Sequence, residues 1–163
     1  NLEIAWEDYV STQRSSAIII FDLDHFKKIN DNFGHDGGDL VLSAIGDAVR
    51  PYMRVGDVIG RWGGEEFLCV LRGAKGHQLQ FIAERLRAAI EELTMPLSEK
   101  LGAPCLISAS FGVAQFSEDD RCSTDAVTRA DKALYRSKSA GRNRVSLGGT
   151  LNFSTTIRSV SRV

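Results

Sequence analysis

Residues 17–23 read AIIIFDL, a short apolar run rich in β-branched side chains with an aspartate near its end. Such a run is typical of a strand that is buried on both faces at the centre of a sheet. Residues 58–61 and 67–71 are also strand-like, and Gly63 and Gly64 between them predict a hairpin turn. We expect the first strand to lie beside the second strand of this hairpin, so that the acid at its end approaches the turn.

Helices are predicted between the strands by apolar side chains at helical spacing. They cover residues 26–33, 39–52 and 79–93, and a last helix follows a cap at Ser123 or Thr124 and ends at Gly141. Further strands are predicted at residues 105–109, 111–116 and 144–147. The order β-α-α-β-β-α-β-α-β indicates an α+β fold, in which a mainly antiparallel central sheet is flanked by helices around a ferredoxin-like core.

The length of 163 residues, the net charge of −1 and the hydrophobic fraction of 43% are typical of one globular domain. A nearly balanced charge gives no overall attraction to nucleic-acid backbones, so we expect no nucleic-acid partner. We assign residues 1–149 to the domain. Residues 150–163 are rich in Ser and Thr without periodicity, which predicts a poorly ordered C-terminal tail.

Three widely spaced cysteines and the lack of an apolar run of membrane-spanning length predict a reducing, cytoplasmic location. The chain starts at Asn1 rather than at a methionine. We therefore expect an upstream sensory or regulatory domain in a longer protein, in a region that can also carry a membrane tether.

Four acids are expected to converge on one edge of the sheet: Asp22 and Asp24 after the first strand, and Glu65 and Glu66 after the hairpin turn. Carboxylates this close repel one another in the absence of a cation. Hard oxygen ligands of this kind suit Mg²⁺ or Mn²⁺ bound to the phosphates of a nucleotide. The alternative is an exposed acidic rim that binds nothing.

Phosphate binding would have to use backbone groups, because the sequence contains no P-loop motif. The helix that starts after the first strand offers free N–H groups at His25 and Phe26. Gly63 and Gly64 leave the hairpin turn without side chains, so that a ligand can lie close over its backbone. An ordinary hairpin turn is the alternative for the two glycines.

Side chains from two other segments complete a candidate nucleotide site. Lys138 and Arg142 could contact phosphate, although cations near the end of a helix are also favoured by the helix dipole. Asn30 and Asp39 flank a glycine-rich bend, and an amide and a carboxylate together suit the hydrogen-bonding edge of guanine. Both residue types are also common helix caps.

Taken together, these segments resemble the GGDEF family of diguanylate cyclases, in its GGEEF variant. The motifs stand in the family's order as FDLDHFKKIND (residues 21–31), GHDGGD (34–39), RWGGEEF (61–67), SASFGV (108–113) and ADKALYRSKSAGRN (130–143). The resemblance implies a nucleotidyl-cyclase-type palm core. It also implies an enzyme that condenses two GTP molecules into cyclic di-GMP and releases pyrophosphate, as a homodimer of GTP-loaded domains.

The resemblance also implies a role for each site residue. The metal ligands would be Asp22, Glu65 and the backbone carbonyl of Leu23, with Mg²⁺ or Mn²⁺ as the cofactor and Glu66 as a further catalytic carboxylate. The substrate would be bound by Asn30 and Asp39 at guanine, by Lys138 and Arg142 at phosphate, and by the backbone of His25, Phe26, Gly63 and Gly64.

The resemblance further implies that Arg54 and Asp57 are the R-x-x-D motif of the family's inhibitory site, where the product cyclic di-GMP would bind, with Arg85 as a secondary contact there. From the residues alone, a local salt bridge across a turn is the alternative. Two other functions stay open at this point: a non-catalytic receptor for cyclic di-GMP, and a GTP-sensing module without turnover.

Overall fold

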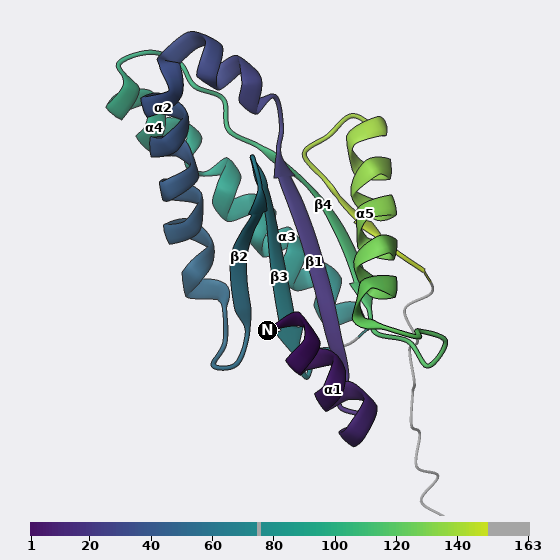
Figure 1. The fold of residues 1–163 in the computed structure, drawn as a ribbon. Coiled ribbons are helices and arrows are strands. Elements are labelled where there is room, and N and C mark those ends of the chain that lie inside the picture. Colours follow the sequence, from purple (N-terminus) through teal and green to yellow (C-terminus); the bar gives the residue numbers. More distant parts are fainter. Residues whose placement is uncertain (75, 150–163) are drawn as a thin grey trace, which may run out of the picture.

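The computed structural model describes residues 1–74 and 76–149. A five-stranded sheet runs through the centre of the molecule in the order β2-β3-β1-β4-β5 (Figure 1). The strands are β1 (Ser16–Leu23), β2 (Val58–Gly63), β3 (Glu66–Arg72), β4 (Ala109–Gln115) and β5 (Val145–Leu147). All neighbours pair antiparallel except β4 and β5, which are parallel. The predicted α+β class and the antiparallel core of the sheet are confirmed.

Helices cover both faces of this sheet (Figure 1). The helical elements are α1 (Leu2–Thr12), α2 (Phe26–Val49), the 3₁₀ turn η1 (Arg50–Tyr52), α3 (His77–Glu91), α4 (Thr94–Leu101) and α5 (Ser123–Ser139). Helices α2, α3 and α4 pack on one face, and α1 and α5 pack on the other. Strand β1 between β3 and β4, with helical crossovers, gives the ferredoxin-like arrangement that the sequence predicts.

Strand β1 is buried along its whole length, as its apolar sequence predicts. Successive side chains of a strand point to opposite faces of the sheet. Ile19 and Phe21 accordingly pack into the core beneath α2 and α3, whereas Ile18 and Ile20 pack against α1 and α5. One short segment therefore anchors both helical layers and fixes where its acidic end emerges.

Three phenylalanines from three different motifs hold the central strands in register next to that acidic end. Phe21 on β1 lies directly opposite Phe67 on β3 and Phe111 on β4. The ring centroids are 5.0 and 4.9 Å apart, and both pairs are stacked. Such aromatic pairs stabilise a sheet beyond the apolar area that they bury. The stack therefore fixes the relative positions of the strand ends that carry the candidate site.

The structure corrects several predicted boundaries. Helix α1 was not predicted, although Leu2, Ala5, Trp6 and Tyr9 stand at helical spacing. The break predicted between the helices at residues 26–33 and 39–52 is confirmed by the non-helical backbone of Gly34 inside α2, but the second helix ends at Val49 and η1 replaces its predicted last turn. The third helix ends at Glu91 and a separate α4 follows.

The predicted strand at residues 105–109 is also wrong for most of its length. Residues 104–108 have no regular secondary structure, and β4 begins only at Ala109. The backbone N–H groups of Cys105 and Ile107 donate to the hydroxyls of Ser98 and Thr94 on α4 rather than to a neighbouring strand.

At α5 the N-cap residue is Cys122, and no side chain caps the helix, so the predicted Ser123 or Thr124 cap is not formed. The predicted tail at residues 150–163 lies outside the described residues.

Candidate active site

A cleft of about 300 Å³ lies between α2 and the β2–β3 hairpin. Its lining combines apolar, acidic, basic and amide side chains, and all but Leu42 belong to three of the sequence motifs: Phe26, Lys27, Asn30, His35, Asp39, Leu42, Arg61, Gly64 and Glu65. Five of these are predicted substrate-binding or catalytic residues. The structure thus gathers segments that are far apart in the sequence around one space of suitable size for part of a nucleotide.

The kink in α2 shapes one wall of this cleft. Gly34 has φ 72° and ψ 177°, which is neither helical nor readily adopted by a residue with a side chain. Beyond the kink, the backbone of Gly38 lies so close to Asn30 that a Cβ added at Gly38 would come within 1.9 Å of the Asn30 Oδ1 atom. The glycine-rich bend therefore lets Asn30 and Asp39, nine positions apart, face the same cleft.

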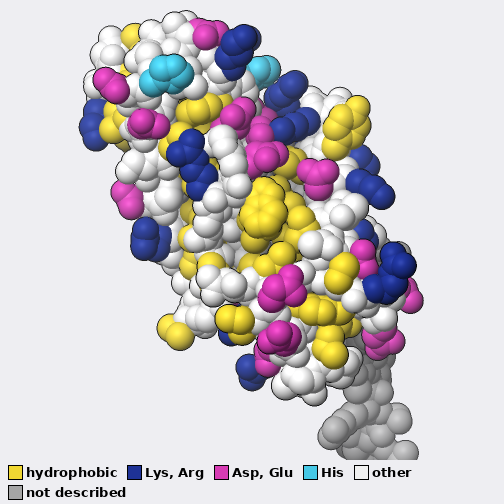
Figure 2. Space-filling view, viewed as in Figure 1, with side chains coloured by type: hydrophobic (Ala, Val, Ile, Leu, Met, Phe, Trp, Pro, Cys, Tyr) yellow, Lys and Arg dark blue, Asp and Glu magenta, His cyan; other side chains and the backbone are white. Residues whose placement is uncertain are grey.

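Asp22 lies at the end of β1, only 7% exposed, and forms the acidic centre of the candidate site. The Lys138 ammonium on α5 is 2.9 Å from its Oδ2 atom, which joins a predicted phosphate ligand to a predicted metal ligand. Burial raises the pKa of Asp22; the hydrogen bond and charge of Lys138 oppose this shift, while the charges of Glu65 and Glu66 add to it. Asp22 is therefore paired with one lysine and lies near two further carboxylates. Figure 2 shows acidic side chains gathered at this end of the sheet with basic ones on either side.

The β2–β3 turn brings the two glutamates to this edge. Gly64 has φ 47°, a left-handed conformation that glycine adopts readily, whereas Gly63 is still part of β2. The Arg61 guanidinium donates to the Gly64 carbonyl at 2.5 Å, and a bulge between Arg61 and Gly63 breaks the pairing. Glu66 lies directly opposite Asp22 in the β1–β3 pairing. The turn is therefore held in a defined shape beside Asp22.

Among residues 1–74 and 76–149, no group of three or more His, Cys, Asp or Glu side chains is arranged to hold a metal ion. The predicted ligand set needs only two carboxylates, Asp22 and Glu65, together with the Leu23 carbonyl. The backbone N–H of Leu23 donates to the Glu65 carbonyl at 3.4 Å, which brings residues 23 and 65 together. These are hard oxygen donors in an acidic group, and their chemistry fits Mg²⁺ or Mn²⁺.

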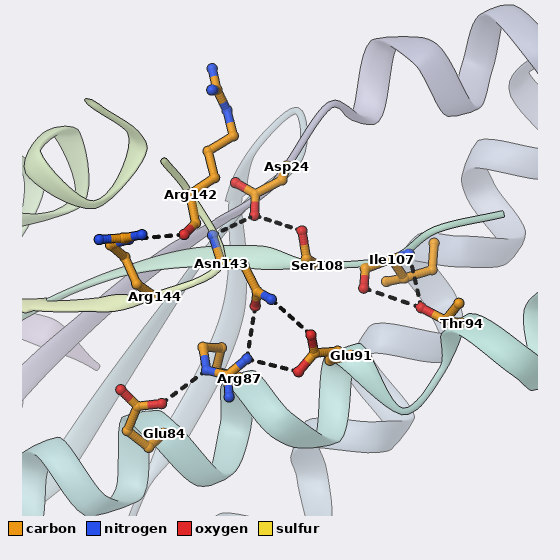
Figure 3. A network of polar contacts seen from close by, with 10 residues as sticks. All are labelled: Asp24, Glu84, Arg87, Glu91, Thr94, Ile107, Ser108, Arg142, Asn143 and Arg144. Atoms are coloured by element: carbon orange, nitrogen blue, oxygen red, sulfur yellow. Dashed lines mark hydrogen bonds and ion pairs between the residues drawn. The ribbon is translucent and has the colours of Figure 1, made fainter. Parts of the chain in front are cut away.

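Asp24 does not belong to this acidic group, and the prediction that four acids converge is wrong. Asp24 is 4% exposed, and its carboxylate points into a polar network (Figure 3). The Oδ1 atom accepts from the Ser110 hydroxyl at 2.7 Å, and Oδ2 accepts from the Ser108 hydroxyl at 2.8 Å and the Asn143 backbone N–H at 3.0 Å. Asp24 therefore ties the end of β1 to β4 and to the turn after α5.

The remaining predicted substrate residues lie around the same end of the sheet. His25 adopts φ 59° and forms the N-cap of α2, which starts at Phe26, so the first N–H groups of this helix have no partner within it. Arg142 lies in the turn after α5 and directly precedes Asn143, which contacts Asp24. Sequence reasoning did not single out Lys27, His35 and Arg61, which also line the cleft. Each of the three lies inside one of the sequence motifs that carry the family resemblance, and this position is the sequence feature that could have identified them.

The predicted inhibitory residues lie on a different part of the surface. Asp57 is not paired with the Arg54 side chain; its carboxylate accepts from the backbone N–H groups of Arg54 at 2.9 Å and Arg72 at 3.0 Å. Arg85 on α3 lies over the ring of Tyr52 at 4.8 Å from the centroid, beside the same turn. The alternative of a salt bridge between Arg54 and Asp57 is therefore not formed, and the Arg54 side chain is exposed.

A ferredoxin-like sheet with carboxylates at the end of its central strand and a nucleotide-sized cleft beside them describes a palm-like nucleotidyl cyclase fold. A family model described as "Diguanylate cyclase, GGDEF domain" matches residues 1–144. The chain belongs to this family.

Known proteins resemble the chain in both sequence and structure. It is 38% identical over 131 residues to diguanylate cyclase A of Treponema denticola, in a match that covers 80% of this chain and 34% of that protein. The chain thus spans about a third of the length of this curated relative.

Two solved structures match at similar levels. The active GGEEF domain of a diguanylate cyclase from Vibrio cholerae gives a TM-score of 0.83 at 32% identity, covering 91% of this chain and 92% of that one. The GGDEF domain of DgcB from Caulobacter crescentus, in complex with c-di-GMP, gives 0.84 at 26% identity, covering 91% and 86%. No helix among residues 1–74 and 76–149 has the length and apolar character needed to cross a membrane.

Proposed function

We propose that this chain is the catalytic domain of a diguanylate cyclase, which condenses two GTP molecules into cyclic di-GMP and two pyrophosphates. In each of two equivalent steps, a ribose 3′-hydroxyl loses its proton to solvent and its oxygen forms a bond to the α-phosphorus of the other GTP, while the bond from that phosphorus to the bridging oxygen of pyrophosphate breaks. The observation that supports this function best is the cleft in which Asn30, Asp39 and Glu65 meet, next to the buried Asp22.

The guanine is proposed to lie in this cleft. The Asp39 carboxylate would accept from the N1–H and the exocyclic amine, and the Asn30 amide would bond to the base alongside it. Adenine lacks the N1 proton, so it would leave the carboxylate without a donor. Sites built around such hydrogen bonds discriminate strongly against analogues that lack them.

The phosphates are proposed to lie between the start of α2 and the end of α5. There the N–H groups of His25 and Phe26 and the cations of Lys138 and Arg142 would offset their charge. Asp22, Glu65 and the Leu23 carbonyl would hold a divalent cation. When bound, it supplies polarisation of the α-phosphate and stabilises charge on the leaving pyrophosphate. Glu66, opposite Asp22, would be a further carboxylate at the reacting end.

One such site holds only half of the reactants, so we propose that two copies of the chain face each other during the reaction. Arg54, with Arg85 beside it, is proposed to bind the product and slow the reaction, because an exposed guanidinium can pair with both phosphate and the guanine O6 and N7 atoms.

The test is to incubate the protein with GTP and Mg²⁺ or Mn²⁺ and to quantify cyclic di-GMP and pyrophosphate by chromatography. We expect both products, at a specific activity that rises with protein concentration and then levels off. ATP should not replace GTP. The matched control is Asp22→Asn, which retains the shape of the side chain without its charge.

Binding measurements on the same protein, read together with product formation, separate the alternatives. Binding of cyclic di-GMP without product formation at any protein concentration would identify a receptor. Binding of GTP alone would identify a GTP-sensing module. Progress curves with added cyclic di-GMP, for wild type and Arg54→Ala, test the inhibitory site, and we expect only the wild type to slow early.

A further inference from the structure

The turn that follows α5 has an unusual backbone. Gly141, Arg142 and Asn143 all have positive φ, at 108°, 64° and 44°. Left-handed conformations are common for glycine but unfavourable for residues with side chains, and Asn tolerates them better than Arg. Two consecutive non-glycine residues in this region need contacts that hold them there. The contacts of this turn therefore decide whether its conformation persists.

Asn143 is bound through its backbone N–H and through both polar atoms of its side-chain amide. Its backbone N–H donates to the Asp24 Oδ2 atom at 3.0 Å. Its side-chain Oδ1 accepts from the Arg87 guanidinium at 2.8 Å, and its Nδ2 donates to the Glu91 carboxylate at 2.8 Å. Arg87 and Glu91 both lie on α3, whereas Asp24 follows β1. Asn143 is thus bound from two sides by elements that are far from it in the sequence.

The partners of Asn143 are themselves fixed in place. Arg87 donates from Nε to Glu84 at 2.9 Å and from Nη1 to Glu91 at 2.8 Å, so its planar guanidinium is held at both ends on α3. The Asp24 carboxylate is fixed by the hydroxyls of Ser108 and Ser110. Both partners are therefore restrained by contacts that do not involve the turn.

The two residues of the turn point in opposite directions. In Figure 3 the Asn143 side chain extends toward Arg87 and Glu91, and the Arg142 side chain extends the other way, on the side of Asp24. The backbone of Arg142 is fixed at the α5 end, where its N–H donates to the Ser137 carbonyl at 3.0 Å. The direction of the Arg142 side chain is consequently set by the conformation that Asn143 holds.

We propose that Asn143, held by Arg87, Glu91 and Asp24, is a positioning residue that fixes the left-handed turn and thereby directs the Arg142 guanidinium at the phosphates of the substrate. This inference rests on the phosphate role proposed for Arg142. It predicts that Arg87 on α3, which lies outside the cleft, affects substrate affinity. If the turn relaxes, the Arg142 guanidinium is displaced and loses a charge-assisted contact with phosphate.

The test is a double-variant cycle on nucleotide affinity. The ligand is a GTP analogue with a methylene group between the α- and β-phosphorus, and its equilibrium binding is measured in the presence of Mg²⁺. The proteins are wild type, the single variants Asn143→Ala, Arg87→Met and Arg142→Ala, and the two double variants that combine Asn143→Ala or Arg87→Met with Arg142→Ala. We expect Asn143→Ala and Arg87→Met to weaken binding by about tenfold, with unfolding temperatures close to wild type. In the Arg142→Ala background both changes should have little further effect.

Turnover provides a second measurement on the same variants. Asn143→Ala should raise KM for GTP more than it lowers kcat, because a phosphate contact made in the ground state is lost. The matched control is Arg121→Ala. It removes an arginine whose side chain is 91% exposed and whose Nε atom lies 3.9 Å from the Asp125 carboxylate. Affinity and KM of this control should be unchanged.

The outcomes are distinct. Effects of Asn143→Ala and Arg142→Ala that simply add would show that Asn143 does not act through Arg142, and would overturn the inference. Unchanged affinity in Arg142→Ala itself would refute the phosphate role and the inference with it. A protein that shows the expected binding pattern but forms no cyclic di-GMP would refute the proposed reaction while supporting the positioning role.

Discussion

Asp22 and Asp24 are two residues apart, both are buried, and both stand at the end of β1, yet their surroundings are opposite. Asp24 accepts three hydrogen bonds from Ser108, Ser110 and Asn143. Asp22 has one cation, Lys138, and lies among the charges of Glu65 and Glu66.

The contrast separates a carboxylate that holds the fold from one that is available to a ligand. A buried carboxylate with several donors is stabilised as part of the structure, and its donors lose their partner if it is removed. A buried carboxylate among like charges is destabilised in its ionised form, a condition that recurs at functional sites. We therefore expect substitutions at the two positions to affect different properties of the protein.

The largest effect is expected on activity at Asp22. Asp22→Asn should lower the rate of cyclic di-GMP formation on the order of a hundredfold or more, because a group that stabilises charge at the reacting phosphate is lost. Circular dichroism should show an unchanged fold. Activity near that of wild type would mean that Asp22 is not part of the reacting centre.

Stability should respond instead at Asp24. Asp24→Ala leaves two hydroxyls and one backbone N–H without their acceptor, and we expect a loss of about 3 kcal/mol in the free energy of unfolding. Urea denaturation of Asp24→Ala and Asp22→Asn side by side measures the difference. Equal stabilities of the two variants would remove the distinction drawn between the two positions.

The pH dependence of stability should also distinguish them. Burial raises the pKa of Asp22 above its ordinary value of 3.8, so the folded protein holds this proton more tightly than the unfolded chain does. The stabilisation that results is lost as the pH rises from about 3.8 through the raised pKa. Relative to Asp22→Asn, wild type should therefore become less stable over this rise, in denaturation experiments with a metal chelator present. A constant difference would contradict the raised pKa.

The smallest effect is expected at the outer end of the Asp24 network. Glu84 pairs with Arg87 within one helix, and its side chain is 43% exposed. Pairs of this kind contribute little, so Glu84→Gln should change the free energy of unfolding by less than about 1 kcal/mol. The measurement is the same urea titration. A loss as large as that of Asp24→Ala would show that the network acts as one unit out to Glu84.

The sequence predicted the parts of the fold that depend on local pattern. The buried strand at residues 17–23, the hairpin at Gly63 and Gly64 and the helix that carries Lys138 all have clear periodicity or turn residues, and all are confirmed. Helix α1 had such a pattern and was missed. Residues 104–108 have no regular secondary structure and bond to side chains of α4, and propensity alone cannot distinguish such a segment from a strand.

The candidate site was predictable as a set of residues but not as an arrangement. Asn30, Asp39, Glu65 and Asp22 were named from their types and motifs, and the structure brings them to one end of the sheet. The separation of Asp24 from the acidic group depends on hydroxyls that approach it from β4 and on a turn near the end of the chain. Contacts between residues so far apart leave no local signal in the sequence.

The position of β1 in the sheet has a consequence for the synthesis of the protein. Ser16–Leu23 leaves the ribosome before Glu66–Arg72 and long before Ala109–Gln115, the two strands that pair with it. Until those partners emerge, an apolar β-branched segment has two open edges, and such segments are prone to aggregate. Sheets built from pairings this distant also form slowly. The nascent chain therefore carries an unpaired apolar strand from the time Ser16–Leu23 has emerged until the strand that ends at Gln115 has emerged.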